Sequence, residues 1–450
     1  MDRLIYNELL QWKESEDRKP LILLGARQVG KTYILKQFGQ QAFDSCIYIN
    51  CHNNEFAASI FRSFDIDRII TDIERHTDKH IEEGKTLLIF DEIQEVHNGI
   101  ASLKYFCEDK PGLHVAVAGS LLGLTMHQGE SFPVGKVDML FMYPMTFMEY
   151  LKACGKPAII NALRENDWRA IELEREYLEN RLREYYFTGG MPEAVGEFIR
   201  TGNTKKTRQI QLNIIDAYSR DISKHTKTEA QRIHQVWESI PAQLAKENKK
   251  FIFGIIKKGA RAAQFEMAVQ WLVDAGLIYK VERCKAPELP LKFYVDNAAF
   301  KIYLLDVGLL AAMSQTEPKD ILLGNKVFSE FKGAFSENYV LQQLKPISGV
   351  NTYYFSKDNS QLEIDFLLQC AGRIIPVEVK SEENVKSKSL HTFVDNHMNE
   401  GKGLRISMKQ HIEQDWMENI PLCATAPYFE KIMSENNGYT VNPQQPNSKS

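Results

Sequence analysis

The 450-residue sequence lacks paired cysteines, long apolar runs and an excess of basic residues. Its seven cysteines are scattered without a C-x-x-C pair, which favours reduced thiols over disulfides or zinc and indicates a cytoplasmic protein. No stretch approaches about 18 apolar residues, and the first residues do not resemble a secretory signal, so we expect no membrane span. The net charge of −4 argues against a wholly basic surface, so any DNA contact must be local.

What is present is the composition of a globular protein, with 44% hydrophobic and 25% charged residues. A chain of this length is too long for one hydrophobic core, so we expect several domains. Apolar runs alternate with helical patterns up to about residue 150, which predicts an α/β fold with a parallel sheet covered on both faces.

The most informative stretch is GARQVGKT at 25–32, which fits G-x-x-x-x-G-K-[ST] and follows an apolar run at 21–24. Glycines let the backbone turn its N–H groups toward phosphate oxygens, and a helix N-terminus adds to the attraction for anions. In such a loop the lysine reaches the β and γ phosphates and the threonine hydroxyl ligates Mg2+. The predicted ATP-binding residues are Gly25, Ala26, Arg27, Gln28, Val29, Gly30, Lys31 and Thr32.

A second apolar run, 86–90, ends at Asp91 and Glu92, where ligands bind in open α/β sheets. We expect Asp91 to hold Mg2+ and Glu92 to polarise the attacking water; the alternative is that Asp91 only caps the next helix. Ser120 follows a further strand, where it would sense the γ-phosphate or serve as an ordinary helix cap.

Together with LLIFDE and VAGS, this motif makes residues 19–150 resemble an AAA-type ATPase domain. The whole chain resembles a prokaryotic family in which such an ATPase precedes a nuclease-like C-terminal domain of poorly defined function; YPMTF at 143–147, GGMPEA at 189–194 and DVGLL at 306–310 carry that likeness. The family is expected to have an arginine near Lys136. Arg220 and Arg261 are the alternative arginine fingers, and an arginine from a neighbouring subunit of a homo-oligomer stays open.

A second candidate centre lies in 361–380, which reads as a β-hairpin turning at Ala371 and Gly372. The expected register places Asp365 opposite Glu378 and Glu363 opposite Lys380, with all four side chains on one face. Facing carboxylates repel unless a cation such as Mg2+ or Mn2+ lies between them.

This hairpin resembles the PD-(D/E)xK nuclease superfamily. The resemblance implies that Asp365 and Glu378 ligate a metal, that Glu337 on a preceding helix adds a ligand, and that Lys380 orients water or steadies transition-state charge. The alternative is a nuclease-like fold that serves only as a scaffold or a DNA-binding surface.

Helices followed by strands at 277–281 and 291–295 suggest a winged-helix module, and a basic patch there is a candidate phosphate contact: Lys249, Lys250, Lys257, Lys258 and Arg261. The expected organisation is an AAA-type ATPase domain (1–150), a helical lid or linker (151–215), a winged-helix-like region (216–318), a nuclease-like α+β domain (319–430) and a disordered tail (431–450).

The sequence thus predicts a Mg2+-dependent ATPase whose nucleotide state controls a nuclease-like domain, with DNA as the target. The rival interpretation is an ATP-dependent signalling or scaffold switch with a catalytically inactive nuclease-like fold.

Overall fold

The computed structural model describes residues 2–119, 132–224, 226–246, 249–324, 326–357, 362–381, 387–398 and 401–436. The chain forms two compact units, each assembled from separate segments. The first unit comprises 1–155, 184–280 and 302–318, and the second comprises 156–183, 281–301 and 319–450. The sequence predicts five consecutive domains, whereas each compact unit combines segments that are separate in the chain. The bounds of the five domains therefore stay a prediction.

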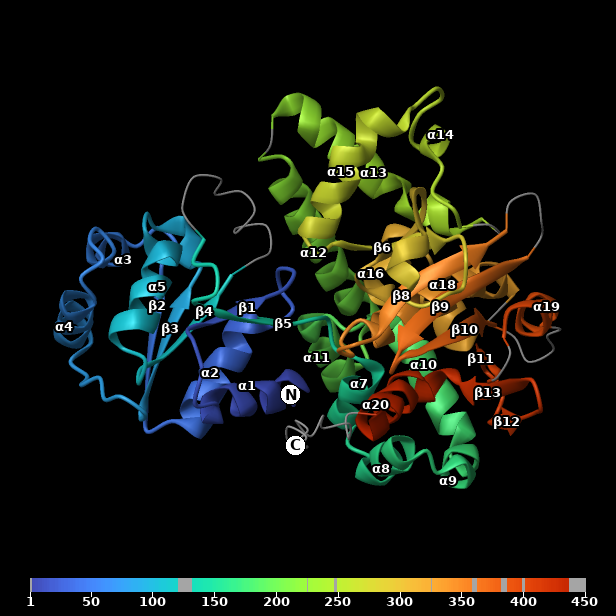
Figure 1. The fold of residues 1–450 in the computed structure, drawn as a ribbon, viewed down its shortest axis with the longest axis horizontal. Helices are drawn as coiled ribbons and strands as arrows, with labels where there is room; N and C mark the ends of the chain where they lie inside the picture. The colour runs from blue at the N-terminus through green and yellow to red at the C-terminus, as the bar shows by residue number, and fades with distance from the viewer. Residues whose placement is uncertain are drawn as a thin grey trace, which may run out of the picture. The chain divides into compact units, whose positions relative to one another are not determined.

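The first unit contains a five-stranded sheet in the order β2-β3-β4-β1-β5 (Figure 1). All neighbouring strands pair in parallel, as expected from apolar runs separated by helices. The three central strands are buried along their whole length, which explains why they lack alternating polar residues. The strands are β1 (Leu21–Leu24), β2 (Ser45–Asn50), β3 (Thr86–Asp91), β4 (His114–Ala118) and β5 (Asp138–Phe141).

Helices connect these strands and cover the sheet (Figure 1). One face packs Ile34, Leu35 and Phe38 of α2 at zero exposure, which is why the helix after the glycine motif carries its apolar residues at 3.6-residue spacing. The helices of this layer are α1 (Ile5–Glu14), α2 (Lys31–Ala42), α3 (Glu55–Ile60), α4 (Ile66–Thr77), the 3-10 helix η1 (Ile93–Glu95) and α5 (Gly99–Asp109).

The rest of the first unit is helical. Its helices are α7 (Phe147–Cys154), α11 (Pro192–Thr201), α12 (Thr204–Ile222), α13 (Lys227–Leu244), α14 (Phe253–Ile256), α15 (Ala262–Asp274) and α16 (Val307–Met313), with α10 (Arg175–Thr188) entering from the second unit. The helices α12 and α16 pack closely against each other, although α13, α14 and α15 lie between them in the sequence.

Three of the sequence motifs meet in what we call the glycine clasp, formed by Met145, Gly190 and Asp306. The N–H of Gly190 donates to Asp306 Oδ2 at 2.6 Å, and the N–H of Met145 donates to the Gly190 carbonyl oxygen at 2.7 Å. Asp306 is fully buried and also caps α16 by accepting from the N–H of Leu309. A Cβ on Gly190 would lie 2.1 Å from the Met145 carbonyl oxygen, so only glycine fits there.

An eight-stranded mixed sheet, in the order β12-β13-β11-β10-β9-β8-β6-β7, dominates the C-terminal part (Figure 1). Its strands are β6 (Ile278–Cys284), β7 (Val295–Leu304), β8 (Asn351–Ser356), β9 (Glu363–Cys370), β10 (Arg373–Val379), β11 (Gly403–Ser407), β12 (Ile412–Glu413) and β13 (Met417–Pro421). The helices of the second unit are α8 (Pro157–Glu165), α9 (Trp168–Leu173), α17 (Pro318–Leu323), α18 (Lys326–Leu344), α19 (Lys388–His397) and α20 (Thr425–Asn436), with short 3-10 helices η2 (Leu291–Tyr294) and η3 (Leu422–Ala424).

The hairpin of β9 and β10 has the expected register, since Cys370 pairs with Arg373 and Phe366 with Val377. Ala371 and Gly372 both have positive φ, +50° and +72°, as a two-residue turn matched to strand twist requires. The apolar residues of β9 therefore fall on the face that the sequence pattern predicts.

Two expectations about the flanking regions were wrong. The second strand expected at 291–295 is a 3-10 helix followed by β7, which lies beside β6 at the edge of the large sheet, and the winged-helix assignment itself stays a prediction. The tail expected to be disordered from residue 431 begins inside α20, which continues to Asn436. Within the described residues, no helix has the length and hydropathy needed to cross a membrane.

Candidate functional site

The glycine motif forms a loop between β1 and α2. Gly25 and Gly30 adopt φ values of +154° and +99°, and Gln28 between them also has positive φ, +66°. A Cβ on Gly25 would lie 2.3 Å from the Met142 carbonyl oxygen of the loop after β5. The two glycines are therefore required for this tight turn, which ends at the N-terminus of α2 as the motif predicts.

Lys31 lies inside this loop with neutral partners. Its Nζ donates to the carbonyl oxygens of Gly25 at 3.0 Å and Ala26 at 2.9 Å. Burial lowers the pKa of Lys31 to about 8, although the negative charges of Glu92 and Asp91 act to raise it. The loop thus holds a buried cation that its surroundings do not fully neutralise, which is the electrostatic condition for binding an anion.

Asp91 ends β3 beside the start of α2. Its Oδ2 accepts hydrogen bonds from Thr32 Oγ1 at 2.8 Å and from the Tyr48 hydroxyl at 2.9 Å. The structure therefore brings together the two residues expected to hold Mg2+, and a metal that keeps most of its waters requires only one or two protein ligands. Thr32 and Asp91 fit that requirement. Tyr48 was not foreseen, because nothing in the sequence distinguishes a tyrosine in β2 from a packing residue.

Glu92 follows directly and adopts a left-handed backbone conformation, with φ +53°. Its N–H donates to the Ala118 carbonyl oxygen of β4 at 3.0 Å, while its side chain accepts a hydrogen bond from Gln94. This strained turn directs Glu92 away from the regular strand at the carboxyl edge of the sheet. Ser120, expected to complete the site, lies outside the described residues.

The helical segment of the first unit contacts the loop at Arg27. Arg27 Nε forms an ion pair with Asp221 Oδ2 of α12 at 3.1 Å, and the Tyr218 hydroxyl donates to the Arg27 carbonyl oxygen at 2.8 Å. Asp221 and Tyr218 are both buried, so these contacts are shielded from water. A change in the loop backbone would therefore alter the contacts that Arg27 makes with α12.

Arg3 holds the same loop from the N-terminal side. Its Nη1 donates to the Val29 carbonyl oxygen at 2.7 Å, and its Nε forms an ion pair with Glu149 at 2.9 Å. The sequence gave no sign that Arg3 would reach the loop.

The residues considered as arginine fingers are occupied elsewhere or exposed. Arg220 pairs with Asp216 one turn away at 2.7 Å, and Lys136 pairs with Glu108 at 2.9 Å. Arg261 is exposed at the start of α15. The contact of an arginine with the γ-phosphate stays a prediction.

The second candidate centre lies on the β9–β10 hairpin. Continuing the observed register places Asp365 opposite Glu378, and Asp365 Oδ2 accepts from the N–H of Val379 at 2.8 Å. Glu378 is 5% exposed; its Oε1 pairs with Lys380 Nζ at 2.9 Å, while its Oε2 is buried and has no hydrogen-bond partner among the residues that the structure describes.

The expected pairing of Glu363 with Lys380 was wrong. The N–H of Lys380 donates to the Ile406 carbonyl oxygen of β11, because β10 has left the hairpin there and joined its parallel neighbour. Glu363 instead forms an ion pair at 2.6 Å with the Nζ of Lys301 on β7. Lys301 is 1% exposed. Its role is not evident from the sequence, because Lys301 is separated from the hairpin by a long stretch of chain.

Glu337 on α18 is buried and belongs to the same cluster. Burial acts to lower the pKa of Lys301 and of Lys380, but nearby carboxylates raise both pKa values above the ordinary lysine value. For Lys301 these are Glu337, Glu363 and Asp365. We call Lys301, Glu337, Glu363, Asp365, Glu378 and Lys380 the acidic cluster.

The acidic cluster contains the residues that the nuclease resemblance assigns to a metal site. Within the described residues, no group of three or more His, Cys, Asp or Glu side chains is arranged to hold a metal ion. Glu378 pairs with Lys380 and Glu363 with Lys301, and the role of Glu337, Asp365 and Glu378 as joint metal ligands stays a prediction. The unpartnered Oε2 of Glu378 is the feature of the cluster that agrees with a missing ligand.

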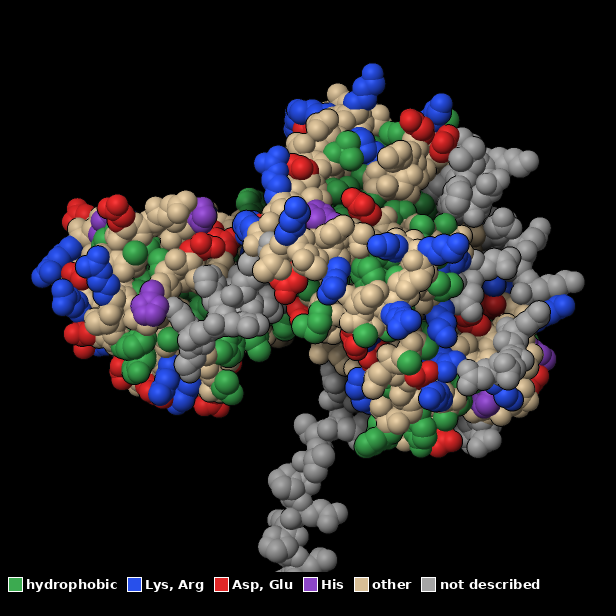
Figure 2. Space-filling model, turned by 90° about the horizontal axis from the view of Figure 1, so that it is seen from above, with side chains coloured by type: hydrophobic (Ala, Val, Ile, Leu, Met, Phe, Trp, Pro, Cys, Tyr) green, Lys and Arg blue, Asp and Glu red, His purple; other side chains and the backbone are tan. Residues whose placement is uncertain are grey.

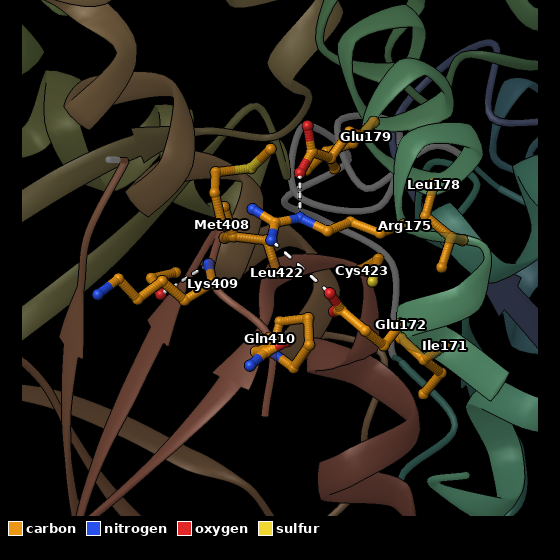
Figure 3. Close-up of a pocket in the computed structure, with 13 residues that line it drawn as sticks. Ile171, Glu172, Arg175, Leu178, Glu179, Met408, Lys409, Gln410, Leu422 and Cys423 are labelled. Carbon is orange, nitrogen blue, oxygen red and sulfur yellow. Dashed lines mark hydrogen bonds and ion pairs between the residues drawn. The ribbon is translucent and has the colours of Figure 1, made fainter. Parts of the chain in front are cut away.

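A cavity in the second unit lies beside α10 and the turns that follow β11 and β13 (Figure 3). Arg175 points into it, but the guanidinium already pairs with Glu179 at 2.8 Å and with Glu172 at 3.8 Å. Its charge is therefore neutralised within the cavity, and Leu178, Leu422 and Cys423 supply apolar lining.

The basic patch is only partly a surface feature. Lys249 is buried, whereas Lys250, Lys257, Lys258 and Arg261 are exposed. On the face shown in Figure 2, lysine and arginine side chains are interspersed with acidic and polar ones and form no single continuous basic surface.

Comparison with known proteins assigns the N-terminal part of the chain. Residues 17–151 match the model of a family described as an AAA domain, while 179–320 and 332–424 match two domains of unknown function, DUF8612 and DUF4143. None of the curated proteins matches. The chain thus carries an AAA-type P-loop ATPase domain.

Solved structures with detectable similarity include the Walker-type ATPase paby2304 of Pyrococcus abyssi, which is 16% identical, with a TM-score of 0.43, over 70% of this chain and 95% of that one. Another is Cdc6p from Pyrobaculum aerophilum, 11% identical, with a TM-score of 0.25, over 72% of this chain and 96% of that one.

Proposed function

We propose that the protein binds and hydrolyses ATP with Mg2+, and that its nucleotide state controls the C-terminal nuclease-like fold, with DNA as the target. The observation that carries the first part is the state of Lys31, a buried ammonium whose hydrogen-bond partners are backbone carbonyls. A triphosphate would supply the negative charge that this loop lacks, and backbone N–H groups at the start of α2 would bind its oxygens.

The residues beside the loop take separate roles. Thr32 and Asp91 would hold Mg2+, whose charge offsets the charge that develops on the transferring phosphoryl group. Glu92 would orient and polarise the attacking water, and its bond with Gln94 fixes the carboxylate in the meantime. Lys31 would bind the β and γ phosphates, so it serves both binding and catalysis.

The contacts of Arg27 support control by the nucleotide. Arg27 lies within the phosphate loop, and both its side chain and its carbonyl oxygen bind α12. A change in the loop on ATP binding or hydrolysis would shift the partners of Asp221 and Tyr218. The helical segment therefore responds to the nucleotide, and α12 in turn packs against α16 of the glycine clasp.

Two substitutions test the ATPase assignment. Lys31→Ala is expected to abolish tight ATP binding and to lower hydrolysis by about 100-fold or more, because a charge-stabilising group is removed from the transferring phosphate. Glu92→Gln is expected to retain ATP binding while hydrolysis falls about 100-fold, the usual size of a general-base effect. Hydrolysis by Lys31→Ala at the wild-type rate would refute the site.

A second candidate function, cleavage of DNA at the acidic cluster, is favoured by the unpartnered Oε2 of Glu378 next to Lys380. Plasmid and linear DNA incubated with Mg2+ or Mn2+, with and without ATP, distinguish the candidates. Cleavage that disappears in both Asp365→Ala and Lys380→Ala would establish a nuclease. Absence of cleavage together with absence of DNA binding would favour the rival function, an ATP-dependent switch whose C-terminal fold recruits another partner.

A further inference from the structure

Lys301 occupies an unusual position on the C-terminal sheet. It belongs to β7, three places from β9 in the order of strands, yet its Nζ reaches Glu363 of β9 at 2.6 Å. The side chain extends across the sheet over β8, with Nζ 4.9 Å from the centre of the Tyr354 ring. An ammonium that lies over an aromatic ring, pairs with a carboxylate and is closed from solvent is held in one place.

The charge of Lys301 is needed there. Glu337 and Glu378 are each 5% exposed, and Asp365 and Glu363 lie on the same face of the hairpin. Several carboxylates removed from water cannot stay ionised together without a positive partner. Lys380 supplies one partner at Glu378, and Lys301 supplies the other at Glu363.

We propose that the ammonium of Lys301 is the resident cation of the acidic cluster and takes the place of the divalent metal that a nuclease of this fold would bind. The C-terminal domain then holds its carboxylates in place without Mg2+ or Mn2+ and acts as a binding module. Removal of the Lys301 charge converts the cluster into a divalent-cation site. This inference does not rest on the ATPase assignment, since it concerns residues of the second unit alone.

Binding of Mn2+ to the nucleotide-free full-length protein, measured by isothermal titration calorimetry, tests the proposal. For wild type, substitution Asp365→Asn is expected to leave Mn2+ stoichiometry and affinity unchanged, because no metal uses that carboxylate. Lys301→Met keeps the length of the side chain and removes its charge. It is expected to gain one Mn2+ per chain, or to tighten weak binding by about tenfold or more, corresponding to about 1.4 kcal/mol.

The additional Mn2+ binding must disappear in the double variant Lys301→Met/Asp365→Asn. This result distinguishes Mn2+ binding at the acidic cluster from Mn2+ binding at the metal position beside Asp91. Lys301→Arg keeps the positive charge and is the matched control, expected to behave as wild type. Two results would overturn the proposal: loss of one Mn2+ from wild type on Asp365→Asn, or a folded Lys301→Met protein that binds no more Mn2+ than wild type.

If Lys301→Met does not fold, the comparison of wild type with Asp365→Asn still decides the question. An Mn2+ site in wild type that depends on Asp365 contradicts a resident ammonium. An unchanged stoichiometry on Asp365→Asn supports it. Circular dichroism shows whether each variant is folded. The Lys301→Met comparison applies if that variant is folded, and the comparison of wild type with Asp365→Asn applies if it is not.

Discussion

Two buried lysines give the two candidate centres opposite electrostatic characters. Lys31 donates to backbone carbonyls, and burial lowers its pKa to about 8. Lys301 pairs with a carboxylate at 2.6 Å, and although burial acts to lower its pKa, three nearby acids raise it above the usual value. In the first centre the lysine is hydrogen-bonded to neutral carbonyls, and Asp91 and Glu92 act on it only through their charges, whereas in the second centre the lysine is paired directly with a carboxylate.

The difference indicates what each centre will accept. A loop with an ammonium bound only to carbonyl oxygens, at the N-terminus of a helix, gains stability when a polyphosphate enters. A cluster with its own cations gains much less from a divalent metal, because the metal must displace an ammonium that is already desolvated and paired. The comparison therefore separates a ligand-dependent site from one that the protein completes by itself.

The largest effect should come from removing each lysine charge in the absence of ligand. Lys301→Met leaves buried carboxylates without a partner and is expected to destabilise the protein by about 3 kcal/mol, as when one member of a buried pair is removed. Lys31→Met removes a charge that burial disfavours and is expected to change stability by less than about 1 kcal/mol. Thermal unfolding of the two variants without nucleotide measures both, and equal losses would break the comparison.

The glycine clasp tests how firmly the helical segment of the first unit is held. Gly190→Ala places a Cβ 2.1 Å from a backbone oxygen and is expected to cost about 2 kcal/mol of stability through overpacking. Gly333→Ala is the control: this glycine lies in α18 with nothing within 4 Å of the added Cβ, so a gain of about 0.5 kcal/mol is expected. Thermal unfolding of the two variants should move in opposite directions, and equal shifts would refute the tight contact.

The pH dependence of ATP binding sharpens the contrast further. With a pKa of about 8, Lys31 of the free protein is protonated at pH 7 and mostly neutral at pH 9. Phosphates favour the charged form, so ATP affinity should be full below pH 8 and fall about tenfold by pH 9. Titrations at both pH values check this, with Lys31→Arg as the control that stays charged. An affinity independent of pH in wild type would contradict the lowered pKa.

The smallest expected effect concerns the contact between the phosphate loop and α12. Asp221→Ala removes the partner of Arg27 and should weaken ATP binding about fivefold, since a shielded ion pair is worth about 1 kcal/mol. Asp216→Ala, on the same helix, removes an exposed pair with Arg220 and should change binding less than twofold. Equal effects of the two substitutions in ATP titrations would show that the contact between α12 and the phosphate loop does not contribute to ATP binding.

Local sequence was sufficient wherever the chemistry of a site lies in one short segment. The glycine motif, the strand before it and the helix after it predicted the loop between β1 and α2, and parallel strands present their carboxyl ends at one edge, which explains why Thr32 and Asp91, both expected to hold Mg2+, lie together. The hairpin register followed from the turn at Ala371 and Gly372.

Contacts between distant segments could not be predicted in this way. Nothing near Lys301 signals that its side chain reaches Glu363 of β9, three places away in the order of strands, and nothing near Arg3 signals that it binds the phosphate loop. The strands β6 and β7 follow helices, as a wing does, but their edge is completed by β8 from much later in the chain. Such pairings depend on tertiary packing, which local propensity does not encode.

The most direct test of the comparison is ATP binding at pH 7, measured by calorimetry on wild type, Lys31→Met and Lys301→Met. We predict one ATP per chain for wild type, loss of binding in Lys31→Met and wild-type affinity in any folded Lys301→Met protein. Wild-type affinity in Lys31→Met would contradict the account, because the charge that the phosphate loop offers to the nucleotide would then come from elsewhere.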